Sequence, residues 1–366
     1  MKVQRIKTKD NRIRYVLLDD NYNIIIPVKN FLKHLDQLNR SIYTLRTYAY
    51  NLKIYYEFLS INKLTYTSIL EKGYRLTILT NFIGYLKNYK EDNVVYLKPI
   101  HSSRSINLIL NTVLSFYRFL VLNGDLPEIV DFTQKSIVKY KNFLYEMHRY
   151  KYNKKSYFKL KEQPRLINTI SRDQLRYILN NCNYLRDKLL ISLMFESGIR
   201  IGEALNMYID DFLVWENRIR IKQHEEYYSL NKVKNHNEDI LDIPPYVMKL
   251  FCRYISYEYP KSEVNNVFVN LSGKNKGHAL KIDTVEKKFK WLSKKCGFKI
   301  NPHMLRHSHA TELIEVGGWD ILDVKNRLRH KHIQTTIDTY INVSDDYKKR
   351  KFMEFIKKLK ENGNDS

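Results

Sequence analysis

The sequence predicts a mainly α-helical protein with a small antiparallel β-sheet, organised as two domains. The chain has 366 residues, a length typical of about two or three domains. Apolar residues recur at steps of three and four over 45–59 and 106–121, as they do on one face of a helix. Short alternating or apolar runs at 215–221 and 240–243 are instead typical of strands that pair as a hairpin.

The first segment, residues 1–29, is expected to contain a β-hairpin. Residues 13–28 read IRYVLLDDNYNIIIPV, two apolar runs around a polar turn; a flap without a special role is the alternative. From residue 30 the helical period dominates, and the sequence LNGDLP at 122–127 is a helix stop. We therefore expect a helical domain over 30–150.

A basic stretch separates this domain from the next. Residues 149–165, RYKYNKKSYFKLKEQPR, lack an apolar period. We predict a linker over 151–168 that follows a phosphate backbone, with DNA contacts from Lys151, Lys154, Lys155 and Lys159. A solvated connector explains this segment alone equally well.

The second domain is predicted over 169–345. Ser171 followed by Gln174 is a capping box that begins a helix, and a helix over 186–197 is stopped by Gly198. A long polar stretch, 222–239, separates the two predicted strands. Further helices are expected from Asn301-Pro302 to Gly317-Gly318, over 320–329 and 334–342, and over the basic tail 346–361, where Phe352, Phe355, Ile356 and Leu359 share a face.

The charge balance points to a polyanionic partner. Lys and Arg number 63 against 39 acidic residues, a net charge of +24, and both 1–160 (+15) and 161–366 (+9) are basic. Such a surface attracts DNA or RNA, although a merely lysine-rich protein would share it.

The sequence also gives expectations about where the protein acts. No apolar run approaches the roughly 18 residues of a membrane span, and no apolar leader begins the chain. The three scattered cysteines suit a reducing cytoplasm.

Three short clusters concentrate side chains that could carry chemistry. In GIRIGEALN (198–206), Arg200 follows a glycine at a helix entrance, where it can bind an anion, and Glu203 lies one turn away; an ordinary surface ion pair is the alternative. In PHMLRHSH (302–309), His303, Arg306 and His307 share a helix face. The third cluster, RLRHKH (327–332), precedes Tyr340.

A zinc site is not expected from the paired histidines. His303 and His307 have the spacing of a metalloprotease helix, but Met304 stands where that motif needs glutamate. Arg306 between them would repel a cation. We therefore assign no metal ligands.

The three clusters together resemble the signature motifs of the tyrosine recombinase, or phage integrase, family. The stretches are ESGIRIGEALNM, PHMLRHSHATELI and LRHKHIQTTIDTY, in this order. The resemblance implies a helical core-binding (SAM-like) domain over 30–150 and a catalytic domain over 169–345. Length and tyrosine content are similar to the transposases of site-specific transposons that use this chemistry.

The resemblance also assigns roles to residues. It implies that Arg200 and Arg306 are the catalytic arginines and that Tyr340 is the nucleophile. His303 and His330 would be the catalytic histidines. Glu203 and His307 would be supporting residues. The family's hairpin lysine corresponds to Lys234, with Lys232 as the rival. One departure is Arg329, where members usually have glycine, and another is the spacing of ten residues between His330 and Tyr340, where many have nine.

The implied activity is site-specific DNA recombination through a 3′-phosphotyrosyl intermediate, with no ATP, metal or other cofactor. Two arginines can bind the non-bridging oxygens of a phosphodiester and stabilise the charge that develops there. The implied partners are double-stranded DNA, a homotetramer on two duplexes, and accessory transposition or excision proteins, in the cytoplasm on the nucleoid. The segment 346–366 would dock on a neighbouring subunit or fold back on the catalytic domain of its own subunit.

Three other functions remain open at this point. A non-catalytic DNA-binding regulator of the same fold would not need the complete set of Arg, His and Tyr residues. A type IB topoisomerase would relax supercoils without exchanging partners. A metal nuclease would lose all cleavage in EDTA.

Overall fold

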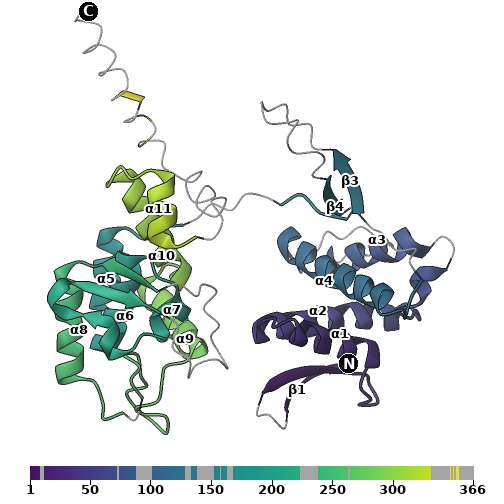
Figure 1. Cartoon of the computed structure of the whole chain (residues 1–366), viewed down its shortest axis with the longest axis horizontal. Helices are drawn as coiled ribbons and strands as arrows, with labels where there is room; N and C mark the ends of the chain where they lie inside the picture. The colour runs from purple at the N-terminus through teal and green to yellow at the C-terminus, as the bar shows by residue number, and fades with distance from the viewer. Residues whose placement is uncertain are drawn as a thin grey trace, which may run out of the picture. The chain divides into compact units, whose positions relative to one another are not determined.

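The computed structural model divides into two compact units, Met1–Pro164 and Arg165–Ser366 (Figure 1). It is mainly helical with small antiparallel sheets, so the predicted fold class is confirmed. The residues that the structure describes are 1–8, 12–71, 74–87, 101–127, 133–137, 152–156, 158–162, 168–222, 238–262, 264–330, 347, 349 and 352–353.

The chain begins with a hairpin, but not the predicted one. Strand β1 (Lys2–Lys7) pairs antiparallel with β2 (Ile13–Leu18). The predicted partner of β2, the apolar run near residue 25, enters helix α1 (Ile26–Gln37) instead. Pro27 in the first turn favours this helix start, and the Asp19 carboxylate accepts two backbone N–H bonds in the turn between. The expected 13–28 hairpin is therefore present only as its turn and one antiparallel bridge between Leu18 and Ile24, and β1 is the strand that pairs along the length of β2.

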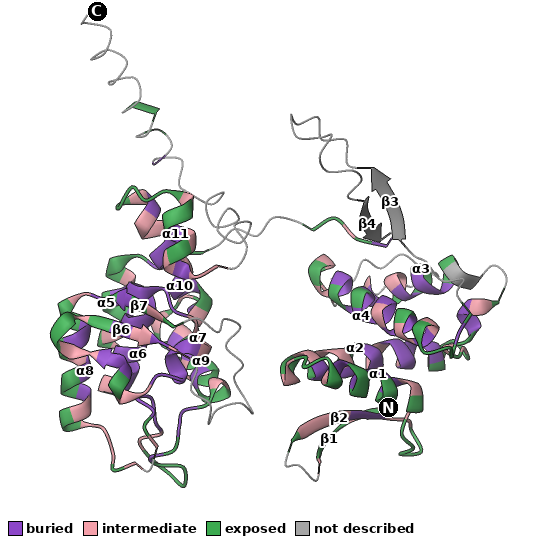
Figure 2. Cartoon of the chain, viewed as in Figure 1, coloured by how far each residue is buried: buried purple, intermediate pink, exposed green. Residues whose placement is uncertain are grey.

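In the described part of the first unit, four α-helices build the core. They are α1, α2 (Ile42–Ile61), α3 (Tyr74–Lys87) and α4 (Ser103–Leu122), with a short 3₁₀ turn η1 (Ser68–Leu70). The side chains of Ser41 and Ser102 cap α2 and α4 by accepting backbone N–H bonds. Helix α4 is long and apolar enough to cross a membrane, yet ten of its residues are buried (Figure 2). It is thus the central core helix of this unit.

Two buried tyrosines join α2 to α4 inside this core. The Tyr55 and Tyr117 hydroxyls are 2.7 Å apart, and the Tyr117 hydroxyl donates to the Tyr66 carbonyl oxygen at 3.0 Å. Both rings are fully buried, and they pack edge to face. Burial raises the pKa of both phenols. The pair therefore stays neutral and hydrogen-bonded over the ordinary pH range.

We expect Tyr117→Phe to destabilise the protein more than Tyr55→Phe. The first change removes both hydrogen bonds and leaves the Tyr66 carbonyl without its donor, at a cost of about 1–3 kcal/mol. The second leaves the bond from Tyr117 to Tyr66 intact. Urea unfolding of the two variants measures the difference, and equal losses would contradict this account of the pair.

A second two-stranded sheet corrects two sequence predictions. Strand β3 (Thr133–Ile137) pairs antiparallel with β4 (Tyr152–Ser156). The range 30–150 is therefore not wholly helical, and the predicted linker 151–168 begins with a strand. Neither run has the apolar alternation of a strand, so local patterns gave no signal. Lys154 and Lys155 lie in β4 and Lys159 is exposed, while Lys151 falls outside the described residues.

The second unit is organised around one buried helix. All but two of the 13 residues of α6 (Leu185–Ser197) are buried (Figure 2). Its apolar side chains belong to one continuous core. Around it lie α5 (Arg172–Asn180), α7 (Ile201–Leu205), α8 (Pro245–Tyr257), α9 (Ile282–Cys296), α10 (Pro302–Glu315) and α11 (Ile321–Leu328).

A three-stranded antiparallel sheet completes this unit. Its order is β5 (Phe212–Leu213), β6 (Arg218–Ile221) and β7 (Asp239–Asp242), with 3₁₀ turns η2 (Ile209–Asp211) and η3 (Val214–Glu216) beside β5. Ile221 pairs with Asp239, so these two residues mark the ends of β6 and β7 from which the stretch 223–237 departs. The predicted strand pair is confirmed. The stretch itself lies outside the described residues.

Several predicted helix boundaries are confirmed in this unit. Ser171 and Gln174 form the capping box, and the Asn301 side chain caps α10. Helix α11 matches the predicted 320–329 helix, whereas 334–342 lies outside the described residues. In the tail, Tyr347 is buried in a cluster with Ala310, Ile314, Val324 and Leu328 of its own unit, while Phe352 is exposed. Phe355, Ile356 and Leu359 also lie outside the described residues.

Candidate active site

The site begins at the junction between α6 and α7. Gly198 ends α6 with φ of +64°, a left-handed conformation that glycine adopts most easily. A Cβ atom there would also meet Leu328 at 2.6 Å and His309 at 2.7 Å. Two residues later Arg200 begins α7. The glycine therefore allows α6, α10 and α11 to approach closely and sets where Arg200 emerges.

Glu203 orients Arg200 from one turn along α7. Its Oε2 accepts the backbone N–H of Arg200, and its Oε1 accepts Nη1 of the same arginine, both at 2.8 Å. Burial alone would raise the pKa of Glu203, but the charge of Arg329 and the contacts of Arg200 lower it below its usual value. The carboxylate is 4% exposed. It is thus a buried, ionised anchor rather than half of a surface ion pair.

Arg306 joins the ends of two helices from within the core. Its Nη1 donates to the Gly198 carbonyl and its Nη2 to the Leu328 carbonyl. It is 6% exposed, whereas the Arg200 side chain is 38% exposed. Burial and the neighbouring positive charge of Arg200 lower the pKa of Arg306. Arg306 therefore supports the local backbone, while Arg200 remains accessible to a ligand.

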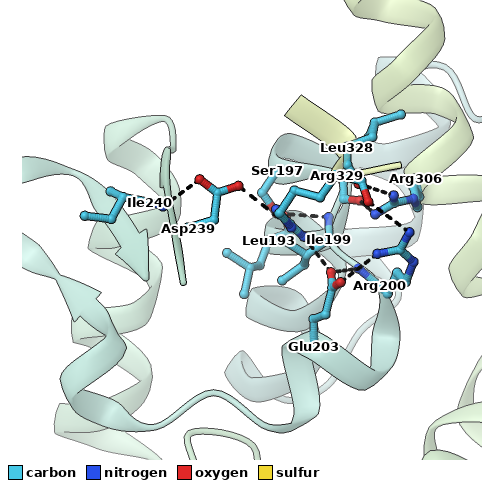
Figure 3. Close-up of polar contacts among 11 residues, drawn as sticks. Leu193, Ser197, Ile199, Arg200, Glu203, Asp239, Ile240, Arg306, Leu328 and Arg329 are labelled. Atoms are coloured by element: carbon cyan, nitrogen blue, oxygen red, sulfur yellow. Dashed lines mark hydrogen bonds and ion pairs between the residues drawn. The ribbon is translucent and has the colours of Figure 1, made fainter. Parts of the chain in front are cut away.

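The two arginines are held by successive carbonyl groups at the end of α11. Leu328 accepts from Arg306, and Arg329 accepts from Nη2 of Arg200 at 3.4 Å (Figure 3). The Arg329 side chain adds a third guanidinium, which donates to Glu203 Oε2 at 2.6 Å. Such a concentration of like charge is stabilised by a bound anion.

The positive charge of these arginines lowers the pKa of three histidines. Partial desolvation, Arg306 and Arg200 lower the pKa of His303, which is exposed near the start of α10. Burial, His303 and Arg306 do the same for His307. Desolvation and the same two arginines lower the pKa of His330 to about 3. The imidazole of His330 is therefore neutral near pH 7, and it is a weak base as long as no anion offsets the charge of the arginines.

The structure thus brings six of the predicted site residues into one region, from three separate stretches of chain: Arg200, Glu203, His303, Arg306, His307 and His330. Lys234, its rival Lys232 and Tyr340 lie outside the described residues. Among the residues that are described, no three His, Cys, Asp or Glu side chains gather in a way that could hold a metal ion.

Sequence reasoning assigned no role to two side chains at this site. Arg329 pairs with Glu203, and its Nε lies 4.0 Å from Asp239 Oδ2. The signal for Arg329 was its presence at a position where the resembled family usually has glycine. Asp239 gave no signal, because nothing in the sequence relates it to a residue 90 positions away.

His309 should make stability depend on pH. Burial and the charges of Arg327 and Arg306 lower its pKa to about 3 from an ordinary 6.5. Between these two pH values the unfolded chain binds more protons than the folded one. The free energy of unfolding therefore decreases as the pH decreases. The loss from His309 is about 2 kcal/mol between pH 7 and pH 5.

We therefore expect His309→Gln to flatten the dependence of the unfolding free energy on pH, even if stability falls overall. Ser308→Ala is the matched control, since it removes a buried hydroxyl that accepts the Ile170 N–H but titrates nothing. This control should lower stability and keep the wild-type slope. An unchanged slope in His309→Gln would show that the folded protein protonates this ring as readily as the unfolded chain does.

The arrangement suits a singly charged phosphodiester. An accessible guanidinium can form two parallel hydrogen bonds to non-bridging oxygens. A second one, buried and fixed by backbone carbonyls, needs no reorganisation during a reaction. A bound phosphodiester offsets the charge of the arginines and raises the basicity of the neutral imidazole beside them, which can then accept a proton from an attacking group. The site can therefore stabilise a pentavalent phosphorus and activate a nucleophile brought to it.

Comparison with known proteins gives a consistent picture. The model of the Phage integrase family matches residues 168–346. Transposase A from transposon Tn554 of Staphylococcus aureus is 34% identical over 363 residues, which are 98% of this chain and 99% of that protein. Tyrosine recombinase XerA of Pyrococcus furiosus is 25% identical over 314 residues, 84% of this chain and 87% of that protein.

Solved structures share the fold. A lambda integrase dimer bound to a core site superposes with a TM-score of 0.56 at 12% identity, covering 87% of this chain and 95% of that one. The XerH recombinase bound to its difH substrate before cleavage superposes with a TM-score of 0.55 at 19% identity, covering 86% and 81%.

Proposed function

The chain belongs to the phage integrase family of tyrosine recombinases, and from that premise we propose that it cuts and rejoins DNA through a 3′-phosphotyrosyl intermediate at a site formed by Arg200 and Arg306. It is an enzyme of DNA strand transfer at specific sites. The finer statement, which residues act and how, is supported by the geometry around α7, α10 and the end of α11.

The two arginines stabilise the scissile phosphate in different ways. Arg200 is accessible and points from a rigid helix start, so it contacts the non-bridging oxygens directly. Arg306 presents its charge from the same region while its nitrogens hold two carbonyls. Their combined charge stabilises the phosphorane as negative charge grows on those oxygens.

Proton transfer accompanies attack and departure. The Tyr340 hydroxyl attacks phosphorus, and neutral His330 accepts its proton, with His303 and His307 shaping the local charge. The bond from phosphorus to the 5′-oxygen breaks, and that oxygen takes a proton from Lys234, or from its rival Lys232. Attack by the 5′-hydroxyl of a partner duplex reverses these transfers and releases Tyr340. The bond energy is retained in the phosphotyrosine, so neither ATP nor a metal ion is needed.

Transposition is the reaction that similarity along nearly the whole chain favours. The relative that aligns along 98% of this chain is named a transposase from a transposon. We infer that this chain recombines the ends of a mobile element on the bacterial nucleoid, as four subunits on two duplexes and with accessory transposition or excision proteins. Lys151, Lys154, Lys155 and Lys159 are the proposed backbone contacts of the basic segment, and residues from 346 onward connect subunits.

One observation carries the proposal. The carbonyls of residues 328 and 329, directly before His330, hold the guanidiniums of Arg306 and Arg200. The first and second motifs are about a hundred residues apart, and the second and third are more than twenty apart. All three therefore meet around one position. A DNA-binding regulator without chemistry would not need this convergence.

The test is a plasmid that carries two copies of the DNA flanking this gene, incubated with the protein in EDTA. We expect recombinant products whose size follows the spacing of the copies, because arginine and lysine supply the positive charge. Relaxation of supercoils without recombinants would identify a topoisomerase. Loss of all cleavage in EDTA, restored by magnesium, would identify a metal nuclease.

A further inference from the structure

Arg329 occupies a backbone position that suits glycine. It ends α11 with φ of +54° and ψ of +46°, in the left-handed region. A residue with a Cβ atom is disfavoured there. A residue keeps such a disfavoured backbone conformation when the contacts around it, including those of its side chain, hold it there.

The Arg329 guanidinium lies between two carboxylates (Figure 3). Its Nη2 donates to Glu203 Oε2 at 2.6 Å, and its Nε lies 4.0 Å from Asp239 Oδ2. The side chain is 10% exposed. Its orientation and its acidic neighbours make it a poor phosphate ligand, so any role in the reaction passes through those neighbours.

Glu203 is the link from Arg329 to Arg200. The Oε2 atom that accepts from Arg329 also accepts the Arg200 backbone N–H, while Oε1 accepts Arg200 Nη1. The carbonyl of Arg329 accepts Nη2 of Arg200 as well. Arg329 therefore acts on the direction of Arg200 twice, once through the carboxylate and once through its own backbone.

Asp239 gives the same side chain a second attachment. It is the first residue of β7 and pairs with Ile221, the last residue of β6. The ion pair from Arg329 to Asp239 thus connects the end of α11 to the edge of the sheet from which 223–237 departs. The two contacts join the third motif both to the first motif and to the sheet.

We propose that Arg329 is a positioning residue that fixes the Glu203 carboxylate, and through it the direction of the Arg200 guanidinium, while Asp239 anchors it to the sheet. This inference rests on the proposed function, because it assigns Arg329 a part in the binding of the scissile phosphate by Arg200.

The experiment measures the single-turnover rate of covalent adduct formation on a nicked duplex carrying the recombination site, together with the affinity for the same duplex. Arg329→Gly and Arg329→Asn both tolerate the left-handed backbone but lack the guanidinium. We expect a rate loss of about 10- to 100-fold, as for outer partners of active-site groups, with DNA affinity changed less than about threefold. Arg329→Lys, which can still reach Glu203, should recover part of the rate.

A double-mutant cycle separates positioning from simple stability. If Arg329 acts through Glu203, then adding Arg329→Gly to Glu203→Gln should change the rate by less than about threefold. Arg218→Asn is the matched control, because it breaks an arginine–aspartate pair to Asp242 on the same strand, β7, without contacting Glu203. This control should retain the wild-type rate.

Each outcome decides a different point. Multiplicative losses in the double variant, or Arg329 variants that react like Arg218→Asn, would overturn the positioning role while leaving the proposed function intact. Absence of any adduct with the wild-type protein on a substrate that it binds would instead reject the proposed function, and the positioning role with it.

Discussion

Tyr340→Phe is expected to abolish covalent capture of DNA while leaving DNA affinity within about twofold of the wild type. The change removes only the phenolic oxygen, whose bond to phosphorus is the proposed chemical step. Arg200, which binds the phosphate, and Arg306, which adds its charge to the site, are untouched. The measurement is denaturing electrophoresis of protein incubated with a nicked, end-labelled duplex, beside a gel-shift assay on the same DNA.

A matched tyrosine serves as the control for this change. Tyr347→Phe alters a tyrosine a few residues further along the chain, whose buried ring contacts Ala310, Ile314 and other side chains of its own unit. It should form adducts at the wild-type rate. Adducts that persist in Tyr340→Phe, or vanish equally in both variants, would show that the nucleophile is another group.

Arg200→Lys and Arg306→Lys are expected to slow adduct formation by similar factors, about 10²–10³, yet to differ in stability. Lysine keeps the charge but cannot form the paired hydrogen bonds of a guanidinium. At Arg306 it also deprives the buried carbonyls of Gly198 and Leu328 of a donor, at a cost of about 1–3 kcal/mol. The half-exposed Arg200 should lose less than about 1 kcal/mol.

Single-turnover rates and urea unfolding of the same preparations test this contrast. Arg176→Lys, an exposed residue of α5 paired with Asp173, is the control and should change neither quantity. Equal stability in the two active-site variants would mean that Arg306 does not support the ends of α6 and α11. A wild-type rate in either variant would remove that arginine from the phosphate site.

Local sequence signals were reliable where one short stretch determined the structure. The Gly198 stop, the Ser171 capping box and the Asn301 cap each depend on backbone geometry within a few residues, and each is present. Helices α8 and α9 were not predicted, although both carry the helical period, for example Val285, Phe289 and Leu292 in α9. Those two could have been found.

Strand pairing was the part that local patterns could not supply. Residues 13–18 had two possible partners, and the choice of 2–7 followed from the helix that begins at Ile26. Strands β3 and β4 are polar runs without an apolar alternation, so their pairing is visible only in three dimensions. A strand built from polar residues leaves no apolar period in the sequence.

The candidate site divides in the same way. The resemblance of their three motifs to the tyrosine recombinase signatures predicted that Arg200, Arg306 and His330 belong to one site. The contacts that fix them were not predictable, because they involve backbone carbonyls and pairs between residues 126 and 90 positions apart, such as Arg329 with Glu203 and with Asp239. The motif resemblance predicts which groups take part, whereas packing determines how they are held.

The most direct test of the central claim is to identify the amino acid that becomes linked to DNA. Protein trapped on a nicked duplex would be digested with nuclease and protease, and the nucleotide-bearing peptide sequenced by mass spectrometry. The account predicts a single modified peptide that carries a 3′-linked nucleotide on Tyr340. A nucleotide on a serine, on a histidine or on any other tyrosine would contradict it.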